Sequence, residues 1–166
     1  MPVKYVFDQS ERVADFVVRS KIASGATTYA GFPDKGVRAI GIENADKELI
    51  AGIVYFNYKR DVGTIDMSVE ALPKQRWLTP TTIAIMFQYP FLECGCQEVI
   101  TRTEARNEHV LRMLAALNFT LIRIPRAAGR HEDGVIAVLT DDDWVASKFC
   151  RRYGHHLADI KPAVAA

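Results

Sequence analysis

Three carboxylates lie in or directly after predicted strands, where they could do acid–base chemistry. Glu70 is near the end of a predicted strand over residues 64–71, Asp66 lies earlier in that strand, and Glu104 follows a predicted strand over 98–103. A carboxylate at a strand end can take a proton from a reacting group, either directly or through water. The alternative for each of the three is an ordinary solvated or salt-bridged side chain.

A second feature is an amphipathic helix predicted over residues 107–117, whose start should favour anions. The side-chain oxygen of Asn107 can accept from free N–H groups of the first turn, and the helix dipole favours negative charge there. Glu108 and Arg112 have the spacing of an i,i+4 ion pair, and Asn118 stands where a left-handed residue often ends a helix. The helix between two strands forms a unit of βαβ type, in which helix N-termini often bind anionic cofactors.

The rest of the sequence predicts the elements that position these residues. Strands are expected over residues 3–7, 37–43, 49–58, 64–71, 98–103, 120–124 and 134–139, and helices over 10–21, 81–92, 107–117 and 141–152. A polar loop is expected over 126–133. This order is α/β with a mixed sheet. Residues 1–154 read as a single domain, and the Ala-rich segment 155–166 is expected to be a flexible tail.

Composition excludes several classes of protein. The chain has 166 residues, 49% of them hydrophobic and 25% charged, as in an ordinary soluble globular protein. A net charge of +1 gives no strong signal for nucleic acid or a membrane surface. No apolar run approaches the ~18 residues of a membrane span, and the N-terminal apolar segment is too short for a signal peptide.

The cysteines indicate a reducing compartment. Cys94, Cys96 and Cys150 are an odd and sparse set, which favours reduced structural thiols in the cytoplasm. The Cys-x-Cys pair lacks the two-residue gap of zinc knuckles, and no histidine has a partner at metal-ligand spacing. No metal site is therefore expected.

Several motifs resemble the GNAT (GCN5-related N-acetyltransferase) superfamily over about residues 38–145. Asn107, Leu117 and Phe119 match a late signature of that family, with Asn118 in place of a glycine. The order of strands and helices is also the same. The resemblance implies an α/β GNAT fold, in which a mostly antiparallel mixed sheet is splayed in the middle and flanked by helices.

Two finer resemblances are present. The C-terminal part is similar to the ribosomal-protein N-acetyltransferase branch, through residues 107–119, 126–129, 133–136 and 143–144. Three other segments resemble small GNAT-like proteins encoded by phages and prophages, namely residues 51–56, 76–80 and 89–91.

The family resemblance also implies a binding mode for acetyl-CoA as cosubstrate. The pantetheine arm would lie between the two splayed strands, bonded to backbone groups from Val69 to Ala71, in the manner of an added strand. Asn107 would lie near the same arm. The pyrophosphate would lie over the N-terminus of the helix predicted over 81–92.

The loop before that helix departs from the family pattern. GNAT proteins have small residues there that let the backbone close on phosphate, whereas residues 75–81 contain no glycine. Trp77 could crowd a diphosphate, although packing is the favoured interpretation for it. Charge and hydroxyl groups for the phosphates could come instead from Lys74, Arg76, Thr79, Thr81 and Thr82.

The resemblance implies an acetyl-CoA-dependent N-acetyltransferase. An amine would attack the thioester directly, with Glu70, Glu104 or Asp66 as general base. The acceptor could be a protein N-terminus, a small amine or a nucleobase, with Tyr29, Phe32 and Tyr58 lining its side of the site. Many GNAT enzymes have a tyrosine general acid where this chain has Leu114.

The alternative is a GNAT-fold binding or assembly module without acetyl transfer. The glycine-free loop and the missing tyrosine favour this alternative. The exposed last strands and the final helix could also support a homodimer.

Overall fold

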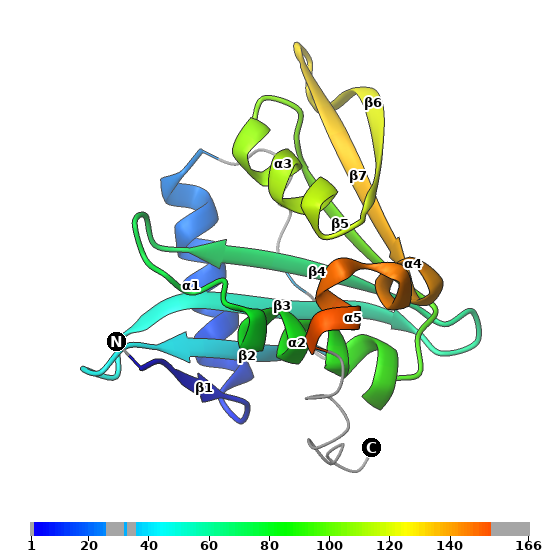
Figure 1. Cartoon of the computed structure of the whole chain (residues 1–166). Coiled ribbons are helices and arrows are strands. Elements are labelled where there is room, and N and C mark those ends of the chain that lie inside the picture. Colours follow the sequence, from blue (N-terminus) through cyan, green and yellow to red (C-terminus); the bar gives the residue numbers. More distant parts are fainter. Residues whose placement is uncertain (1, 26–31, 33–35, 154–166) are drawn as a thin grey trace.

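The computed structural model describes residues 2–25, 32 and 36–153, which form one seven-stranded sheet with helices on both faces (Figure 1). The strands are β1 (Lys4–Val6), β2 (Arg38–Glu43), β3 (Leu49–Lys59), β4 (Thr64–Ala71), β5 (Glu98–Glu104), β6 (Thr120–Gly129) and β7 (Glu132–Thr140). The helices are α1 (Ser10–Ala23), α2 (Pro80–Gln88), α3 (Glu108–Ala116), α4 (Asp141–Ala146) and α5 (Lys148–Tyr153), with one π-helical turn, η1 (Tyr89–Glu93). The tail predicted over 155–166 lies outside the described residues.

The sheet has the order β1-β2-β3-β4-β5-β7-β6. Neighbouring strands are antiparallel except for β4 and β5, which pair in parallel near the middle. The predicted fold class, a mixed and mostly antiparallel α/β sheet with flanking helices, is confirmed. None of the helices in the described residues is long and apolar enough to span a membrane.

The two faces of the sheet carry separate cores. On one face α1 packs against β2 and β3 through a small apolar cluster that includes Val13, Val17 and Val54. On the other face α2, α3 and α4 pack on the sheet through a larger cluster that includes Phe87 and Leu114. Figure 1 shows α1 behind the sheet and the other helices in front of it.

Two glycines bring α1 close to the sheet. Gly41 on β2 and Gly52 on β3 lie opposite each other in the β2–β3 pairing. A Cβ at Gly41 would lie 2.8 Å from a methyl carbon of Val13, and one at Gly52 would lie 2.8 Å from a methyl carbon of Val17. These contacts are shorter than packed carbon atoms allow, so side chains at the two positions would push the helix away.

The helix predicted over 81–92 changes to a π-helical turn because of Pro90. Proline has no N–H, so it cannot donate to the carbonyl of Met86 as an α-helical residue would. The hydroxyl of Tyr55, which is 1% exposed, donates to this carbonyl instead. The next turn closes with Cys94 N–H donating to the carbonyl of Tyr89 at 2.9 Å.

The polar loop predicted over 126–133 is wrong. β6 continues to Gly129 and β7 begins at Glu132, with an irregular register between Ile124 and Gly129. Arg126 has a φ of +57° inside this bulge, and its N–H donates to the carboxylate of Asp133 at 3.0 Å. The polar composition of this segment therefore reflects an exposed, bulged edge hairpin rather than a loop.

The single helix predicted over 141–152 is also wrong, because Ser147 divides it into α4 and α5. Ser147 has an extended backbone with a ψ of 150°. Its hydroxyl donates to the carbonyl of Trp144 at 2.7 Å and accepts from Cys150 N–H at 3.1 Å. One side chain thus satisfies the end of α4 and the start of α5.

Candidate functional site

The main feature of the sheet is a gap between β4 and β5. The two strands pair over three positions, Thr64 with Glu98, Ile65 with Val99 and Asp66 with Ile100. Beyond these positions residues 67–71 and 101–104 are not paired with each other, although β4 pairs with β3 as far as Ala71 and β5 pairs with β7 as far as Glu104. Each strand therefore presents one backbone edge to the gap, as the predicted splay requires. Edges of this kind can bond an extended molecule like an added strand.

Side-chain alternation divides the gap into two faces. Asp66 and Glu70 point toward the face covered by α1, since Glu70 pairs with Lys21 of that helix. Val69 and Ala71 point the other way and pack against the core under α2. Val69 and Ala71, whose backbone groups are predicted to bind pantetheine, thus direct their side chains to one face of β4. The predicted base Glu70 directs its side chain to the other face.

Glu70 lies in β4 directly opposite Gly52, which has no side chain to cover it. Its carboxylate lies 3.2 Å from the ammonium of Lys21, and their side chains are 22% and 12% exposed. Sequence reasoning missed Lys21. The signal was present, because Val13, Val17 and Lys21 recur every four residues on the buried face of α1.

Asp66 has a different environment. It is 5% exposed and accepts from the guanidinium of Arg102 at 2.9 Å and from the amide of Asn57 at 3.3 Å. Asp66 is in the last β4–β5 pair, and Arg102 lies two residues beyond its partner Ile100 on β5. Asp66 therefore holds the two strands together at the start of the gap, which favours the salt-bridged alternative over a base.

Glu104 ends β5 on the other side of the gap and pairs with Gly134 of β7. Its side chain is 6% exposed. It shares a strand face with Arg102, and that face is the one that carries Glu70 on β4, because Arg102 pairs with Asp66. The structure thus places Glu70 and Glu104 on the two arms of the gap, facing the same side.

The start of α2 is largely capped by its own side chains. Thr79 is the N-cap, and its hydroxyl accepts from Thr82 N–H at 3.2 Å. Ile83 N–H donates to the carbonyl of Thr79, and Pro80 has no N–H. Thr81 is exposed, and among the described residues its N–H is the first-turn donor left for a ligand.

Thr82 has a structural role. It is fully buried, donates to the carbonyl of Trp77 at 2.6 Å and bonds the hydroxyl of Tyr5 at 2.8 Å. Trp77 packs against the core, as does Leu78, so neither crowds the space over the helix. The packing interpretation of Trp77 is therefore supported.

Lys74 and Arg76 lie in the loop before α2 and are both exposed. Lys74 has a φ of +63° and follows Pro73, so the chain turns here, directly before the glycine-free loop. Within the described part of the chain neither cation is in an ion pair. Both remain available to an anion near the start of α2.

Asn107 begins α3, but its side chain makes no capping hydrogen bond, so this detail of the prediction is wrong. Its amide instead donates to the hydroxyl of Thr103 at 3.5 Å, across the β5–α3 turn. The left-handed stop is confirmed, with a φ of +75° at Asn118. Leu114 is 4% exposed in the core, so this position of α3 offers no acid.

The aromatic residues predicted on the acceptor side have mixed positions. Tyr29 lies outside the described residues. Phe32 packs edge-on against Phe56, with ring centroids 5.1 Å apart. Tyr58 is at the other end of β4, since its hydroxyl donates to the carbonyl of Cys94 at 3.0 Å. The expectation for Tyr58 is therefore wrong.

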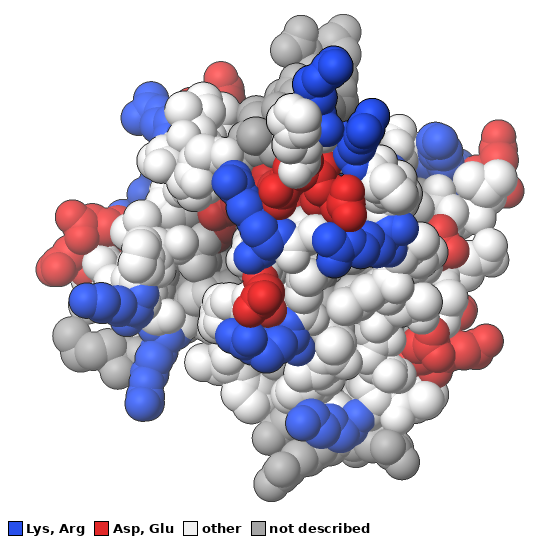
Figure 2. Space-filling model, turned by 90° about the horizontal axis from the view of Figure 1, so that it is seen from above, with Lys and Arg blue, Asp and Glu red and all other residues white. Residues whose placement is uncertain are grey.

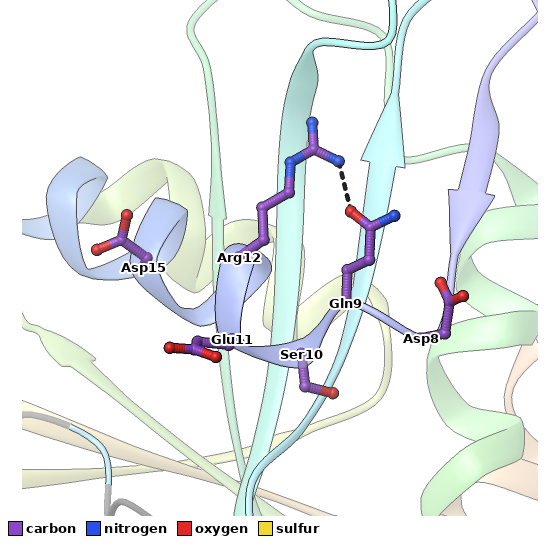
Figure 3. Close-up of a pocket in the computed structure, with 6 residues that line it drawn as sticks. All are labelled: Asp8, Gln9, Ser10, Glu11, Arg12 and Asp15. Carbon is purple, nitrogen blue, oxygen red and sulfur yellow. Dashed lines mark hydrogen bonds between the residues drawn. The ribbon is translucent and has the colours of Figure 1, made fainter.

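A separate hollow lies at the start of α1 and is lined by Asp8, Gln9, Ser10, Glu11, Arg12 and Asp15 (Figure 3). Arg12 turns toward Gln9 and donates to its side-chain oxygen at 3.0 Å, and it also binds the Glu43 carboxylate. None of these residues borders the β4–β5 gap. Arg12 also donates to the carbonyl of Lys47 at 3.0 Å, so the hollow lies where α1 is tethered to the β2–β3 turn.

No protein-family model and no curated protein sequence matches the chain. Its structure is similar to spermidine N-acetyltransferase SpeG from Vibrio cholerae. A mutant form aligns with a TM-score of 0.70 and 11% identity, covering 86% of this chain and 96% of that chain. The chain has the GNAT fold.

Two further structures of the same enzyme agree. A complex with CoA and spermine has a TM-score of 0.69 and 10% identity, covering 86% of this chain and 98% of that chain. A dodecameric form in an intermediate state has a TM-score of 0.66 and 12% identity, covering 86% of this chain and 96% of that chain. At such low identity the likeness concerns the GNAT fold.

Proposed function

We propose that the protein is an acetyl-CoA-dependent N-acetyltransferase. The observation that carries the proposal is the gap between β4 and β5, where two backbone edges diverge inside an otherwise paired sheet. An extended chain with amide groups, such as pantetheine, fits edges of this kind. The presence of CoA in a structure with the same fold supports the assignment.

The proposed cofactor contacts follow from the two faces of the gap. Backbone groups of Val69 and Ala71 would bond the pantetheine amides, and Asn107 would lie beside the same arm. Lys74, Arg76 and the exposed N–H of Thr81 would hold the phosphates. Two cations in place of a glycine-rich loop would make the binding of phosphate more dependent on salt.

Thr79 enters this proposal with a changed role. Its hydroxyl already accepts from Thr82 N–H and lies 3.1 Å from the Thr82 hydroxyl. It would therefore orient the first turn of α2, and Thr81 would be the residue in contact with phosphate.

The acceptor amine would approach from the face covered by α1. Glu70 and Glu104 face this side from the two arms, and either could take the proton that the amine loses as its nitrogen bonds the acetyl carbon. The carbon–sulfur bond then breaks, and the CoA thiolate takes a proton from water, because Leu114 replaces the tyrosine acid. Lys21 would hold the Glu70 carboxylate in place.

We infer that the acceptor is a small aliphatic amine. Figure 2 shows acidic side chains gathered near the middle of one end of the molecule, with basic side chains around them. The carboxylates of Glu70 and Glu104, on the two arms of the gap, would attract a cationic amine. Spermine in a structure of the same fold supports this class. A protein N-terminus remains the second acceptor class, on the resemblance to the ribosomal-protein branch.

A second candidate function is a binding or assembly module that performs no acetyl transfer. The specific observation in its favour is the start of α2, where Thr79 and Pro80 leave the N–H of Thr81 as the first-turn donor. Such a capped helix end would bind pyrophosphate more weakly than an open one.

Thermal unfolding with acetyl-CoA separates the two candidates. A ligand of the folded state stabilises it by about 2.7 kcal/mol at a hundredfold excess over Kd. We expect a clear rise in Tm with acetyl-CoA and CoA, and none with pantothenate at the same concentration. Absence of a shift at millimolar acetyl-CoA would reject the enzyme. Turnover with spermidine or with a peptide N-terminus then identifies the acceptor class.

A homodimer is part of the same proposal. β6 is at the edge of the sheet, and Leu121 and Ile122 on it are 37% and 48% exposed. Val145 on α4 is 63% exposed. Apolar side chains on an open edge strand suit association with a second copy, and light scattering after size-exclusion chromatography measures it.

A further inference from the structure

Cys94, Gly95 and Cys96 form a tight turn between η1 and β5. The N–H of Cys94 donates to the carbonyl of Tyr89, and that of Cys96 donates to the carbonyl of Pro90, each at 2.9 Å. Gly95 has a φ of +66°, which a residue with a side chain rarely adopts. The turn is therefore fixed at both ends and depends on glycine at its centre.

The turn brings the two thiols together in unequal environments. The two side chains are close enough to interact, in a way that favours ionisation of Cys94 and opposes that of Cys96. Cys96 is 2% exposed within the core, whereas Cys94 is at intermediate exposure. One cysteine of the turn is thus partly exposed and the other is buried.

Two tyrosines complete the cluster. Tyr89 is close enough to Cys94 to favour its ionisation, and the hydroxyl of Tyr58 donates to the Cys94 carbonyl at 3.0 Å. The ring of Tyr89 packs on that of buried Tyr55, with centroids 4.8 Å apart. The backbone of Cys94 is thus held by hydrogen bonds at both its N–H and its carbonyl.

These neighbours favour the thiolate of Cys94. Hydrogen bonds from Cys96 and then Tyr89, helped by the more distant charge of Arg38, lower its pKa to about 7 against the opposing effects of burial and Glu93. The pKa of Cys96 is raised, chiefly by its hydrogen bond to Cys94. Low-pKa, partly exposed cysteines are the reactive ones in proteins.

The two cysteines lie away from the proposed site of acetyl transfer. The turn precedes β5 at its paired end, where Gln97 N–H donates to the carbonyl of Gly63 at 2.9 Å, whereas the gap opens at the other end of β4. Figure 1 shows the β3–β4 turn and the start of β5 on one side, and the end of β4 on the other.

We propose that Cys94 and Cys96 form a thiol–disulfide exchange site for small-molecule disulfides. The Cys94 thiolate attacks one sulfur of R–S–S–R, a protein–S–S–R bond forms, and R–S⁻ leaves and takes a proton. The Cys96 thiol then loses its proton to water and attacks the Cys94 sulfur, releasing the second R–S⁻. Two protein thiols are oxidised to one disulfide, and one small disulfide is reduced to two thiols.

Glutathione disulfide at pH 7 is a suitable probe, with intact-protein mass spectrometry as the readout. The wild type should gain one glutathionyl group transiently and end two hydrogens lighter than the reduced protein. Cys96→Ser should stop at the mixed disulfide, and Cys94→Ser should form neither product. Cys150→Ser should behave as the wild type, because burial raises the pKa of that thiol.

The rate gives an independent criterion. At pH 7 a thiol of pKa about 7 is ~16-fold more ionised than one of pKa ~8.5. Its thiolate is a weaker nucleophile, which lowers the rate per thiolate ~5-fold. Cys94 should therefore react about threefold faster than an ordinary exposed thiol. Tyr89→Phe should move the pH–rate curve of Cys94 to higher pH.

Several outcomes would overturn the proposal. One is a mixed disulfide that persists in the wild type as it does in Cys96→Ser, because Cys96 would then not resolve it. Another is a Cys94→Ser variant that reacts as fast as the wild type. Since Cys96 is buried, Cys96→Ala serves as a second variant, and circular dichroism establishes that each variant is folded.

Discussion

The ammonium of Lys21 lies 3.2 Å from the carboxylate of Glu70, so α1 is tied to one arm of the gap between β4 and β5. The carboxylate of Glu104 lies on the other arm, at the end of β5, where Glu104 pairs with Gly134 of β7. Lys21 holds the Glu70 side chain in one orientation. Because this carboxylate is already paired with a cation, it attracts an incoming amine cation less strongly than an unpaired carboxylate would.

Glu70→Gln and Glu104→Gln should distinguish the base from the bystander. Removing a general base costs on the order of 10²–10⁴ in rate, while glutamine preserves the shape of the side chain. We expect one variant to lose about 100-fold or more in kcat and the other to change little. Glu48→Gln, in the exposed turn before β3, is the control. Full activity in both site variants would reject both assignments.

Lys74→Ala and Arg76→Ala should weaken the binding of acetyl-CoA. Both cations are exposed, so each should change Kd by a few-fold, about 0.5–1 kcal/mol at low salt. The loss should shrink as salt is added, because screening removes the same attraction in the wild type. Arg60→Ala, in the turn at the paired end of β4, is the matched control. Isothermal titration at two salt concentrations measures the effect, and equal losses in all three variants would contradict it.

Gly52→Ala should destabilise the fold. The added Cβ would lie 2.8 Å from a methyl carbon of Val17 and 2.9 Å from one of Val13. Overpacking of this kind costs about 1–3 kcal/mol. Urea denaturation measures the free energy of unfolding. In the double variant with Val17→Ala the cost should be less than the sum of the two, and strict additivity would show that α1 does not press on Gly52.

Asn118→Ala should be more harmful than Asn118→Gly. Asn118 has a φ of +75°, and its amide donates to the carbonyl of Asp143 at 2.8 Å, joining the end of α3 to α4. Both variants lose the hydrogen bond. Alanine must also adopt the left-handed backbone conformation, which is strained for a residue with a Cβ and not for glycine. We expect a loss of about 1–2 kcal/mol for alanine and less for glycine. The reverse order in thermal unfolding would count against this explanation of the asparagine.

The hairpin of β6 and β7 should respond to acid through Asp133. Its pKa lies below the ordinary value, because Arg126 N–H and then the side chain of Arg123 donate to it. A carboxylate with a lowered folded-state pKa stabilises the fold above its unfolded value of ~3.9, and the contribution disappears as pH falls through the folded value. Asp133→Asn should therefore flatten the dependence of stability on pH below about pH 4. Asp61→Asn, in the exposed β3–β4 turn, should leave that slope unchanged.

The sequence predicts the fold well where local patterns and chain order agree. The antiparallel strands from β2 to β4 and the helix that ends at Asn118 have strong periodicity and clear turn residues, and the structure places them within a residue or two. The break at Ser147 was missed because a serine within an apolar helical pattern gives no local signal. The π-helical turn at Pro90 leaves the Met86 carbonyl to Tyr55, which lies far away in the sequence.

The candidate site is less predictable than the fold. Glu70, Glu104 and Asp66 can be identified as carboxylates on splayed strands, but their partners come from distant elements. Arg102 and Lys21 reach them only after the sheet and α1 have packed. The capped start of α2 is similar, since Thr82 is directed inward by its contact with Tyr5 on β1. Local patterns place a residue on an element, and the tertiary packing decides which charge it meets.

The short parallel pairing of β4 with β5 has a mechanical consequence. Strands β1 to β4 and strands β5 to β7 form two half-sheets that share backbone hydrogen bonds over only three residue pairs. A ligand hydrogen-bonded to both edges of the gap would join the two half-sheets into one continuous sheet. Amide hydrogens along residues 67–71 and 101–104 would then exchange with solvent more slowly in the complex. Filling the gap should thus make the two halves unfold as a single unit.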